Sequence, residues 1–385
     1  MRAIERRLAT TLTQALRDFP AVVLTGPRRA GKTTLLRRAV PGASYTLLED
    51  PDVLARVRAD PRGFLDELRL PAILDEMQNA PELFAWVRTR IDAAPSRKGR
   101  WLMSGSQEAP LMRGVTESLA GRAALFQLLP ISVEESPKVT LLRGGFPEVL
   151  ARPAAASTWF RSYVQTYLER DVRAVTDIRD LATFRRFLSL VASRVGQMLN
   201  KTDLAAPLGV SVPTIAQWLS ILEITGTLLL VPPYFESFGK RIVKSPKLYF
   251  VDPGLACHLL GIESAAALDR SPFLGAIFEG FVAAEIVKHR VNAGKRPELY
   301  WFRDQQGLEV DFVVPQGERR LMLVEAKAAR TVMPADAASL ERLASAATDH
   351  DVERVVVHRR ATTAAGTTLR PGTRALDVEG LLRRM

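Results

Sequence analysis

The stretch AVVLTGPRRAGKTTLL, residues 21–36, decides the fold of the first part of this chain. It matches the pattern G-x-x-x-x-G-K-[ST] at every fixed position. The two glycines let such a loop wrap a polyphosphate with its amide hydrogens pointing inward. Lys32 supplies a flexible cation for the β- and γ-phosphates, and the Thr33 hydroxyl can hold Mg²⁺. The predicted nucleotide-binding residues of this loop are Gly26, Pro27, Arg28, Arg29, Ala30, Gly31, Lys32, Thr33 and Thr34.

The residues on either side of the loop support this interpretation. Val22-Val23-Leu24 is a short apolar run that is typical of a buried parallel strand. Residues 33–38 then begin a helix whose N-terminal dipole would face the phosphates. The alternative is a glycine-rich turn before an ordinary helix, with no nucleotide bound.

A second motif, Pro71-Ala72-Ile73-Leu74-Asp75-Glu76, is a short apolar strand that ends in two acids. Asp75 at the strand tip can bind the Mg²⁺ hydration shell beside Thr33, and Glu76 can polarise the attacking water as a general base. Acids at strand ends are common, so the motif gains its meaning from its place downstream of the phosphate loop. The alternative is a structural role for both acids.

Two further segments carry candidates for contact with the γ-phosphate. Residues 101–104 predict a strand, and the carboxyl end of a strand in an open parallel sheet faces the ligand crevice. Ser104 or Ser106 could therefore orient the water or bind the γ-phosphate, although a plain strand-to-loop turn fits equally well. Arg122, or Arg113, could reach the γ-phosphate in its own subunit or a neighbour's. Either arginine could instead be a solvated surface residue.

Five short apolar runs separated by helical segments predict a three-layer α/β domain over residues 1–135. The runs are residues 22–24, 44–48, 72–74, 101–104 and 124–129. The segments GPRRAGKTTL, ILDEMQ, LMSGSQ and SLAGR resemble the AAA-type ATPases of bacteria and archaea that carry a C-terminal nuclease-like domain of uncharacterised role. The resemblance implies an AAA+ core that uses ATP and Mg²⁺.

Length and composition set the limits for the rest of the chain. The 385 residues, 47% hydrophobic and 25% charged, predict a soluble globular protein of two or three domains. The chain has one cysteine and four histidines. A single cysteine can form neither an internal disulfide nor a thiolate zinc site, which fits the reducing cytoplasm. The N-terminus lacks the apolar core of a signal peptide, and no apolar run approaches the roughly 18 residues of a membrane span.

The net charge of +11 favours a polyanionic partner, either nucleic acid or an acidic surface. An arginine-rich proteome would give the same excess of positive charge. DNA is the predicted partner, and the ATPase part leads us to expect a homo-oligomer.

Residues 200–231 predict a helix-turn-helix followed by a strand, which is typical of a winged helix. The exposed face of the second helix would present Ser211, Thr214, Gln217 and Ser220 and has no arginine or lysine. The next hairpin carries Lys240, Arg241, Lys244 and Lys247. We therefore expect phosphate contact by the hairpin rather than base readout. The alternative is a winged helix that serves only for packing between domains.

Residues 273–327 predict a helix and three strands that carry a third set of candidate residues. Asp311 and Glu325-x-Lys327 lie on neighbouring strands, with Glu279 on the upstream helix. This order resembles the restriction-endonuclease-like, PD-(D/E)xK, nuclease core. The resemblance implies that Asp311, Glu325 and Glu279 bind Mg²⁺, and that Lys327 activates water or stabilises the pentavalent charge. A catalytically inactive nuclease fold used as a scaffold is the open alternative.

The sequence thus predicts an α/β protein of three parts. Residues 1–135 form an AAA+ P-loop ATPase domain, residues 136–253 a helical segment with a winged helix, and residues 254–385 a restriction-endonuclease-like domain. The predicted function is ATP hydrolysis coupled to engagement of DNA, with metal-dependent cleavage at the third part. The rival prediction is an ATP-driven regulatory switch that acts on a protein partner and carries an inactive nuclease-like domain.

Overall fold

The computed structural model describes residues 4–105, 117–168, 181–234, 245–359 and 366–385. The chain forms two compact units. The first comprises Met1–Ile131 with two short later segments, Ile224–Gly226 and Val291–Lys295, and the second comprises the remaining residues. Each unit is considered by itself below.

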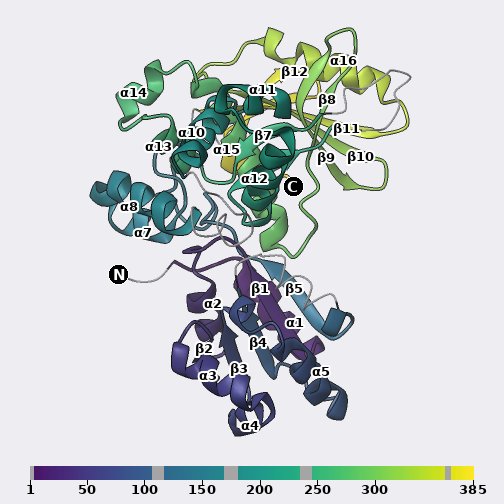
Figure 1. Ribbon diagram of the computed structural model, residues 1–385. Coiled ribbons are helices and arrows are strands. Elements are labelled where there is room, and N and C mark those ends of the chain that lie inside the picture. The colour runs from purple at the N-terminus through teal and green to yellow at the C-terminus, as the bar shows by residue number, and fades with distance from the viewer. Residues whose placement is uncertain (1–3, 106–116, 169–180, 235–244, 360–365) are drawn as a thin grey trace. The chain divides into compact units, whose positions relative to one another are not determined.

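A parallel five-stranded sheet forms the centre of the first unit (Figure 1). Its strands are β1 (Ala21–Thr25), β2 (Ser44–Leu47), β3 (Ala72–Asp75), β4 (Trp101–Ser104) and β5 (Ala123–Gln127). Their order across the sheet is β2-β3-β4-β1-β5. The five strands predicted from the apolar runs are confirmed. The phosphate loop directly follows β1, at the carboxyl edge of the sheet.

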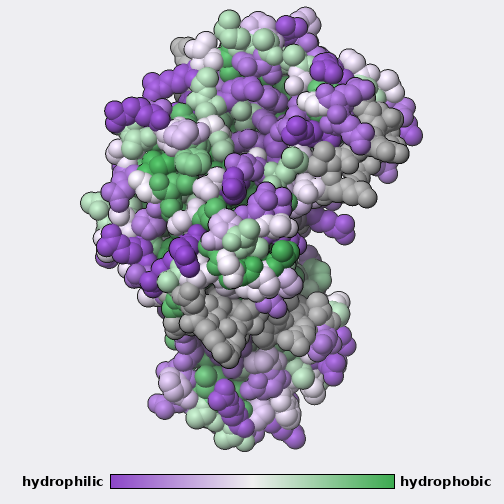
Figure 2. Space-filling model, turned by 45° about the horizontal axis from the view of Figure 1, so that its top comes forward, coloured by the Kyte–Doolittle hydropathy of each residue, from purple (hydrophilic) through white to green (hydrophobic). Residues whose placement is uncertain are grey.

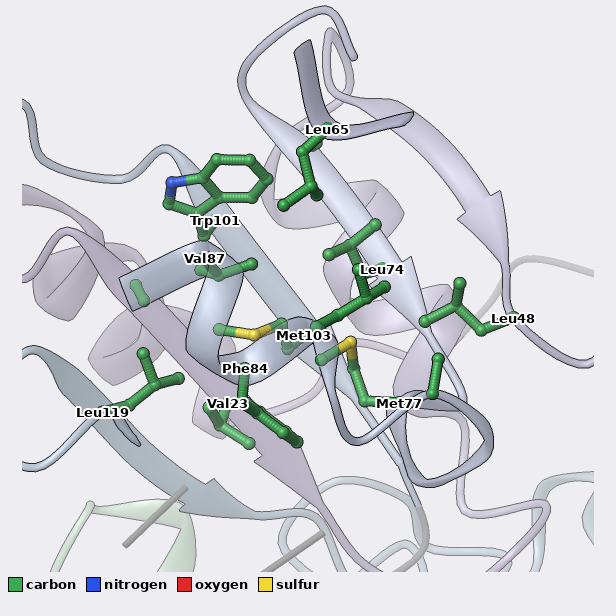
Figure 3. Packing of buried hydrophobic residues seen from close by; sticks show 14 of the residues in the cluster. Val23, Leu48, Leu65, Leu74, Met77, Phe84, Val87, Trp101, Met103 and Leu119 are labelled. Carbon is green, nitrogen blue, oxygen red and sulfur yellow. The ribbon is translucent and has the colours of Figure 1, made fainter. Parts of the chain in front are cut away.

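Helices cover both faces of this sheet because successive residues of each strand alternate between the faces. Val22 and Leu24 join a core with α1 (Leu8–Asp18) and α2 (Lys32–Ala39). Val23 joins the opposite core with the other helices. There Phe84 and Val87 of α5 (Leu83–Ala93) pack near Met103 and Leu119 (Figure 3). The remaining helices of this unit are α3 (Pro51–Ala59), α4 (Pro61–Glu67), α5 (Leu83–Ala93) and the short η1 (Met77–Asn79).

The second unit begins with helices and a strand pair. They are α7 (Pro147–Ala151), η2 (Pro153–Ala155), α8 (Ala156–Tyr163), η3 (Val164–Leu168), α10 (Leu181–Ser193), α11 (Lys201–Ala205), η4 (Ala206–Leu208), α12 (Val212–Ile224), β6 (Leu228–Val231) and β7 (Lys247–Phe250). Gly209 makes the turn before α12 with a φ of 64°, and the Ser211 hydroxyl accepts from the Thr214 amide, capping α12. Trp218 of α12 packs against Phe184 and Phe187 of α10.

The segments Lys201–Leu208 and Val212–Ile224 are bent by 112° relative to each other. Together they meet a membrane-span criterion of length and composition, but no single helix among the described residues is long and apolar enough to cross a membrane. On the face drawn in Figure 2, hydrophilic residues surround smaller areas of hydrophobic ones.

The rest of the second unit is built on a six-stranded mixed sheet with the order β12-β13-β11-β10-β9-β8. Its strands are β8 (Tyr300–Arg303), β9 (Glu309–Gly317), β10 (Arg320–Lys327), β11 (Asp351–His358), β12 (Thr367–Arg370) and β13 (Thr373–Leu376). The accompanying helices are α13 (Pro253–Leu259), α14 (Ala265–Arg270), α15 (Leu274–Asn292), η5 (Pro334–Ala337), α16 (Ala338–Ala346) and α17 (Val378–Leu382). Leu340 and Leu343 of α16 join a core with Val313 and Leu323 of the sheet.

The segments predicted as separate domains, residues 136–253 and 254–385, lie largely in one compact unit. A physical reason is visible at β7, which precedes the predicted boundary. Tyr249 of β7 packs against Phe312 of β9, and Lys247 forms ion pairs with acids of α15 and β9. These contacts tie the strand pair β6–β7 into the core of the later segment.

Candidate functional site

The phosphate loop runs from the end of β1 to the start of α2 in a conformation that requires glycine. Gly26 has a φ of 137° and Gly31 a φ of 98°. A Cβ atom on Gly26 would lie 2.1 Å from the carbonyl oxygen of Leu128, which is closer than atoms can approach. The backbone of Leu128, the residue after β5, therefore lies directly against the loop, and only glycine fits there.

Lys32 is the first residue of α2, and its side chain is buried with 6% of its surface exposed. Its ammonium group donates hydrogen bonds to the carbonyl oxygens of Gly26 at 3.0 Å and Pro27 at 3.1 Å. The cation thus lies inside the curve of the loop, where it can exchange these carbonyl oxygens for phosphate oxygens.

The Asp75 carboxylate accepts hydrogen bonds from hydroxyl groups of three neighbouring elements at the carboxyl edge of the sheet. Thr33 donates to its Oδ2 atom at 2.6 Å, and Tyr45 of β2 donates to the same atom at 2.9 Å. Ser104 of β4 donates to its Oδ1 atom. Burial and the carboxylate of Asp75 raise the pKa of Tyr45 to about 12, so Tyr45 stays a hydrogen-bond donor at neutral pH. The structure therefore brings Thr33, Asp75 and Ser104 together.

Glu76 follows Asp75 with a left-handed φ of 60°, an uncommon conformation for a residue with a side chain. Its Oε2 atom lies 3.7 Å from the Nη1 atom of Arg28 in the phosphate loop. The side-chain amide of Gln78 donates to the same oxygen. The turn after β3 thus directs the Glu76 carboxylate towards the loop, where a general base for water would be needed.

Arg122 lies elsewhere, at the opposite edge of the sheet. Its carbonyl oxygen accepts a hydrogen bond from the amide of Ala21, the first residue of β1. The phosphate loop instead follows the last residue of β1, at the other end of the strand. Its guanidinium group pairs with both carboxylate oxygens of Asp92 in α5, at 2.6 and 3.1 Å. The expectation that Arg122 reaches the γ-phosphate of its own subunit is therefore wrong. The other two candidates, Ser106 and Arg113, lie outside the described residues.

Two residues at this site were not predicted from the sequence. Tyr45 is one: it is the second residue of β2, and its hydroxyl reaches Asp75 at the carboxyl edge of the sheet. The other is Arg6, whose guanidinium group donates to the carbonyl oxygen of Ala30 at 2.8 Å and to that of Leu129 at 2.7 Å. Arg6 thereby fastens the phosphate loop to the segment after β5, and no local pattern signals such a long-range contact.

The residues present fit Mg²⁺ and ATP. The Thr33 hydroxyl and the Asp75 carboxylate, which touch each other, are the hard oxygen ligands that Mg²⁺ prefers. Lys32 and the loop amides would hold the phosphates. When bound, Mg²⁺ would neutralise charge on the phosphate oxygens during hydrolysis.

A second group of charged residues lies in the other unit, and we call Glu279, Glu309, Asp311 and Glu325 the acid cluster. Lys247 of β7 lies among three of these four carboxylates. The Lys247 ammonium lies 2.9 Å from Glu279 Oε1, 2.7 Å from Glu309 Oε1 and 3.6 Å from Asp311 Oδ1.

The predicted nuclease residues are thus near one another. Glu279 interacts electrostatically with Asp311, and Asp311 with Glu325. Lys327 donates to Glu325 Oε1 at 2.8 Å, and the amide of Ala326 donates to Asp311 Oδ2 at 2.9 Å. Three residues of this site were not assigned to it from the sequence: Lys247, Glu309 and Tyr249. The Tyr249 hydroxyl donates a hydrogen bond to Glu279. The spacing of Lys247 and Tyr249, two residues apart and so on one face of a strand, could have indicated their shared environment.

Burial changes the protonation of these groups. Burial and the neighbouring Asp311 raise the pKa of Glu279 and of Glu325 to about 7 in each case. For Lys247, burial acts to lower the pKa, but the carboxylates of Glu279, Asp311 and Glu309 outweigh it and the pKa is raised above its usual value. Lys247 therefore stays charged.

The expectation that Lys247 contacts DNA phosphates is wrong, because only 5% of its side chain is exposed and carboxylates surround it. The other basic residues predicted for that hairpin, Lys240, Arg241 and Lys244, lie outside the described residues.

The acid cluster does not fit a metal ion as it stands. Within the part of the chain that the structure describes, no three Asp, Glu, His or Cys side chains form a group that could hold a metal. Lys247 takes the central position instead. The magnesium site predicted for Glu279, Asp311 and Glu325 is not formed in this arrangement.

Comparison with known proteins adds three family matches. Residues 18–136 match the family described as an AAA domain, residues 135–266 a domain of unknown function (DUF8612), and residues 274–369 another (DUF4143). The uncharacterized proteins Rv2008c of Mycobacterium tuberculosis and Mb2031c of Mycobacterium bovis are each 36% identical over 321 residues, covering 81% of this chain and 71% of theirs. The solved Walker-type ATPase PABY2304 of Pyrococcus abyssi is 16% identical, covers 66% of this chain and 94% of that chain, and has a TM-score of 0.45.

The phosphate loop, the hydroxyl network of Asp75 and the match to the AAA domain define an ATP-binding AAA-type ATPase. The chain belongs to the family of the two mycobacterial proteins Rv2008c and Mb2031c.

Proposed function

We propose that this protein hydrolyses ATP at the loop of residues 26–34 and couples the nucleotide state to the engagement of DNA. The observation that carries the first half is the convergence of Thr33 and Ser104 on Asp75, beside Lys32 and Glu76. These are the groups that ATP hydrolysis needs at one edge of a sheet.

In this proposal each residue has one task. Lys32 leaves the loop carbonyls and contacts the β- and γ-phosphates. Glu76 accepts a proton from the attacking water, while Asp75 and Thr33 hold the cation site. Ser104 keeps Asp75 oriented from β4. We also propose a homo-oligomer, in which Arg122, 37% exposed at the far edge of the sheet, serves the site of a neighbouring copy.

Two features support DNA as the partner. The chain carries a net charge of +11, which favours polyanions. The bent helix pair α11 and α12 with the antiparallel pair β6–β7 has the order and angle of a winged helix. Ser211, which caps α12, and Gln217 and Ser220 of α12 are exposed and suit hydrogen bonds to a DNA backbone.

We propose a restriction-endonuclease-like fold for the C-terminal sheet, in which Asp311 lies on β9 and Glu325 on the adjacent β10. One observation favours a second candidate function. Lys247 occupies the acid cluster where a nuclease would need its metal. The alternative is therefore an ATP-driven switch that acts on a protein partner, with the nuclease-like domain as an inactive scaffold.

Reversing the charges of Lys240, Arg241 and Lys244 to glutamate separates these two candidates. We expect the triple variant to bind DNA about tenfold more weakly or worse, and the slope of log affinity against log salt to fall by about three, because each lost phosphate contact removes about one unit. The measurement is fluorescence anisotropy of labelled single-stranded, duplex, forked and four-way DNA over a salt series, with and without ATP.

The matched control reverses Arg58, Arg97 and Lys98, which are exposed in the first unit. It changes the net charge equally and should leave most of the affinity intact. Equal DNA binding by wild type and both triple variants would rule out the hairpin as the binding site. Absence of salt-dependent DNA binding by wild type would favour the switch that acts on a protein.

A further inference from the structure

The acid cluster contains its own cation. Lys247 Nζ lies between Glu279, Glu309 and Asp311, and it also lies 5.2 Å from the centre of the Trp301 ring. We propose that Lys247 replaces a divalent metal in this cluster, so that the cluster is a metal-independent structural element. This inference concerns the second unit alone and goes beyond the proposed function.

The strand that carries Lys247 is fixed on both edges, which places the ammonium group firmly. On one edge β7 pairs with β6, where Lys247 lies opposite Val231. On the other edge, Leu248 exchanges backbone hydrogen bonds with Gly196 and Gln197 at 2.8 and 3.0 Å. Lys247 therefore differs from a flexible surface lysine that a metal could displace at little cost.

The charges of the cluster are already nearly balanced. Its four carboxylates meet three cations: Lys247, Lys327 on Glu325 and Arg303 at 3.5 Å from Glu309. A divalent cation in addition would leave the cluster positively charged.

Carboxylate oxygens of the cluster already accept hydrogen bonds from the protein. Glu279 Oε1 accepts from both Lys247 and Tyr249, and Asp311 Oδ2 accepts from the Ala326 amide. Among the described residues, Glu325 Oε2 is buried without a hydrogen-bond partner. A metal ion would have to displace the Lys247 and Tyr249 donors from Glu279 Oε1.

The test replaces Lys247 by methionine in the full-length protein and measures Mn²⁺ binding without nucleotide. Lys247→Met removes the cation and leaves buried carboxylates uncompensated, so we expect the melting temperature to fall by about 10 °C. Mn²⁺ should then bind to the uncompensated carboxylates and restore much of this loss. Mn²⁺ binding is measured from the loss of the free-ion signal in electron paramagnetic resonance.

Two variants control this experiment. In Lys247→Met/Asp311→Asn the restoration by Mn²⁺ should disappear, which separates the acid cluster from the nucleotide site. Lys288→Met breaks another fully buried ion pair, with Glu285 at 2.8 Å, and should lose stability that Mn²⁺ does not restore.

Wild type should bind no Mn²⁺ that depends on Asp311. Such binding by wild type, lost in Asp311→Asn, would overturn the proposal even if Lys247→Met and the milder Lys247→Gln do not fold. A folded Lys247→Met variant that gains no Asp311-dependent Mn²⁺ binding would overturn it as well.

Discussion

Replacing Lys32 by alanine is expected to abolish ATP hydrolysis by the full-length protein. The ammonium group of Lys32 lies inside the phosphate loop, held by the carbonyl oxygens of Gly26 and Pro27. Without it, the developing charge on the transferred phosphate loses a preorganised cation, and kcat/KM should fall by about 100-fold or more. Steady-state phosphate release and binding of a fluorescent ATP analogue measure this loss.

Lys98→Ala is the matched control, because Lys98 is exposed and its ammonium group donates to the carbonyl oxygen of Pro95 at 3.0 Å. Its hydrolysis rate should equal that of wild type. Wild-type hydrolysis by Lys32→Ala would show that the loop of residues 26–34 is not the site.

Gly26→Ala is expected to abolish nucleotide binding and to destabilise the first unit. The added Cβ atom would lie 2.1 Å from the carbonyl oxygen of Leu128, and the φ of 137° is unfavourable for alanine. Backbone strain of this kind costs about 1–3 kcal/mol, and the collision with a backbone atom adds to it. The loop must therefore move away from Leu128. Thermal unfolding and binding of the fluorescent ATP analogue measure the two effects.

Gly42→Ala provides the comparison, since Gly42 is exposed and a Cβ atom there would meet nothing within 4 Å. We expect its melting temperature and ATP affinity to stay near the wild-type values. An ATP affinity equal to wild type in Gly26→Ala would contradict the described packing of the loop against Leu128.

The sequence predicted the core of the nucleotide site because parallel strands end at one edge of a sheet. Thr33 lies in the segment after one buried strand, Asp75 ends a second and Ser104 ends a third. The strand assignments were therefore sufficient to predict that these three residues lie together. Arg122 precedes its strand, and by the same rule it had to lie at the opposite, amino edge. Applying the rule to both ends of each strand would have corrected that prediction.

Contacts made over long distances along the chain could not be predicted in this way. Arg6 reaches Leu129 across 123 positions, and nothing near Arg6 indicates its acceptor. Lys247 was assigned to a basic surface because lysines follow one another in that stretch. Its actual environment is formed by acids 32 or more positions later, which balance its charge and allow its burial.

Glu76→Gln tests the central claim most directly, because Glu76 is assigned the proton transfer and not the binding of the nucleotide. The measurement incubates the variant with radiolabelled ATP and Mg²⁺, isolates the complex and determines whether the bound nucleotide is ATP or ADP. The account predicts that the variant binds ATP with wild-type affinity and retains it as ATP, with turnover lowered by about 100-fold or more. Wild-type conversion of bound ATP to ADP by Glu76→Gln would contradict the account.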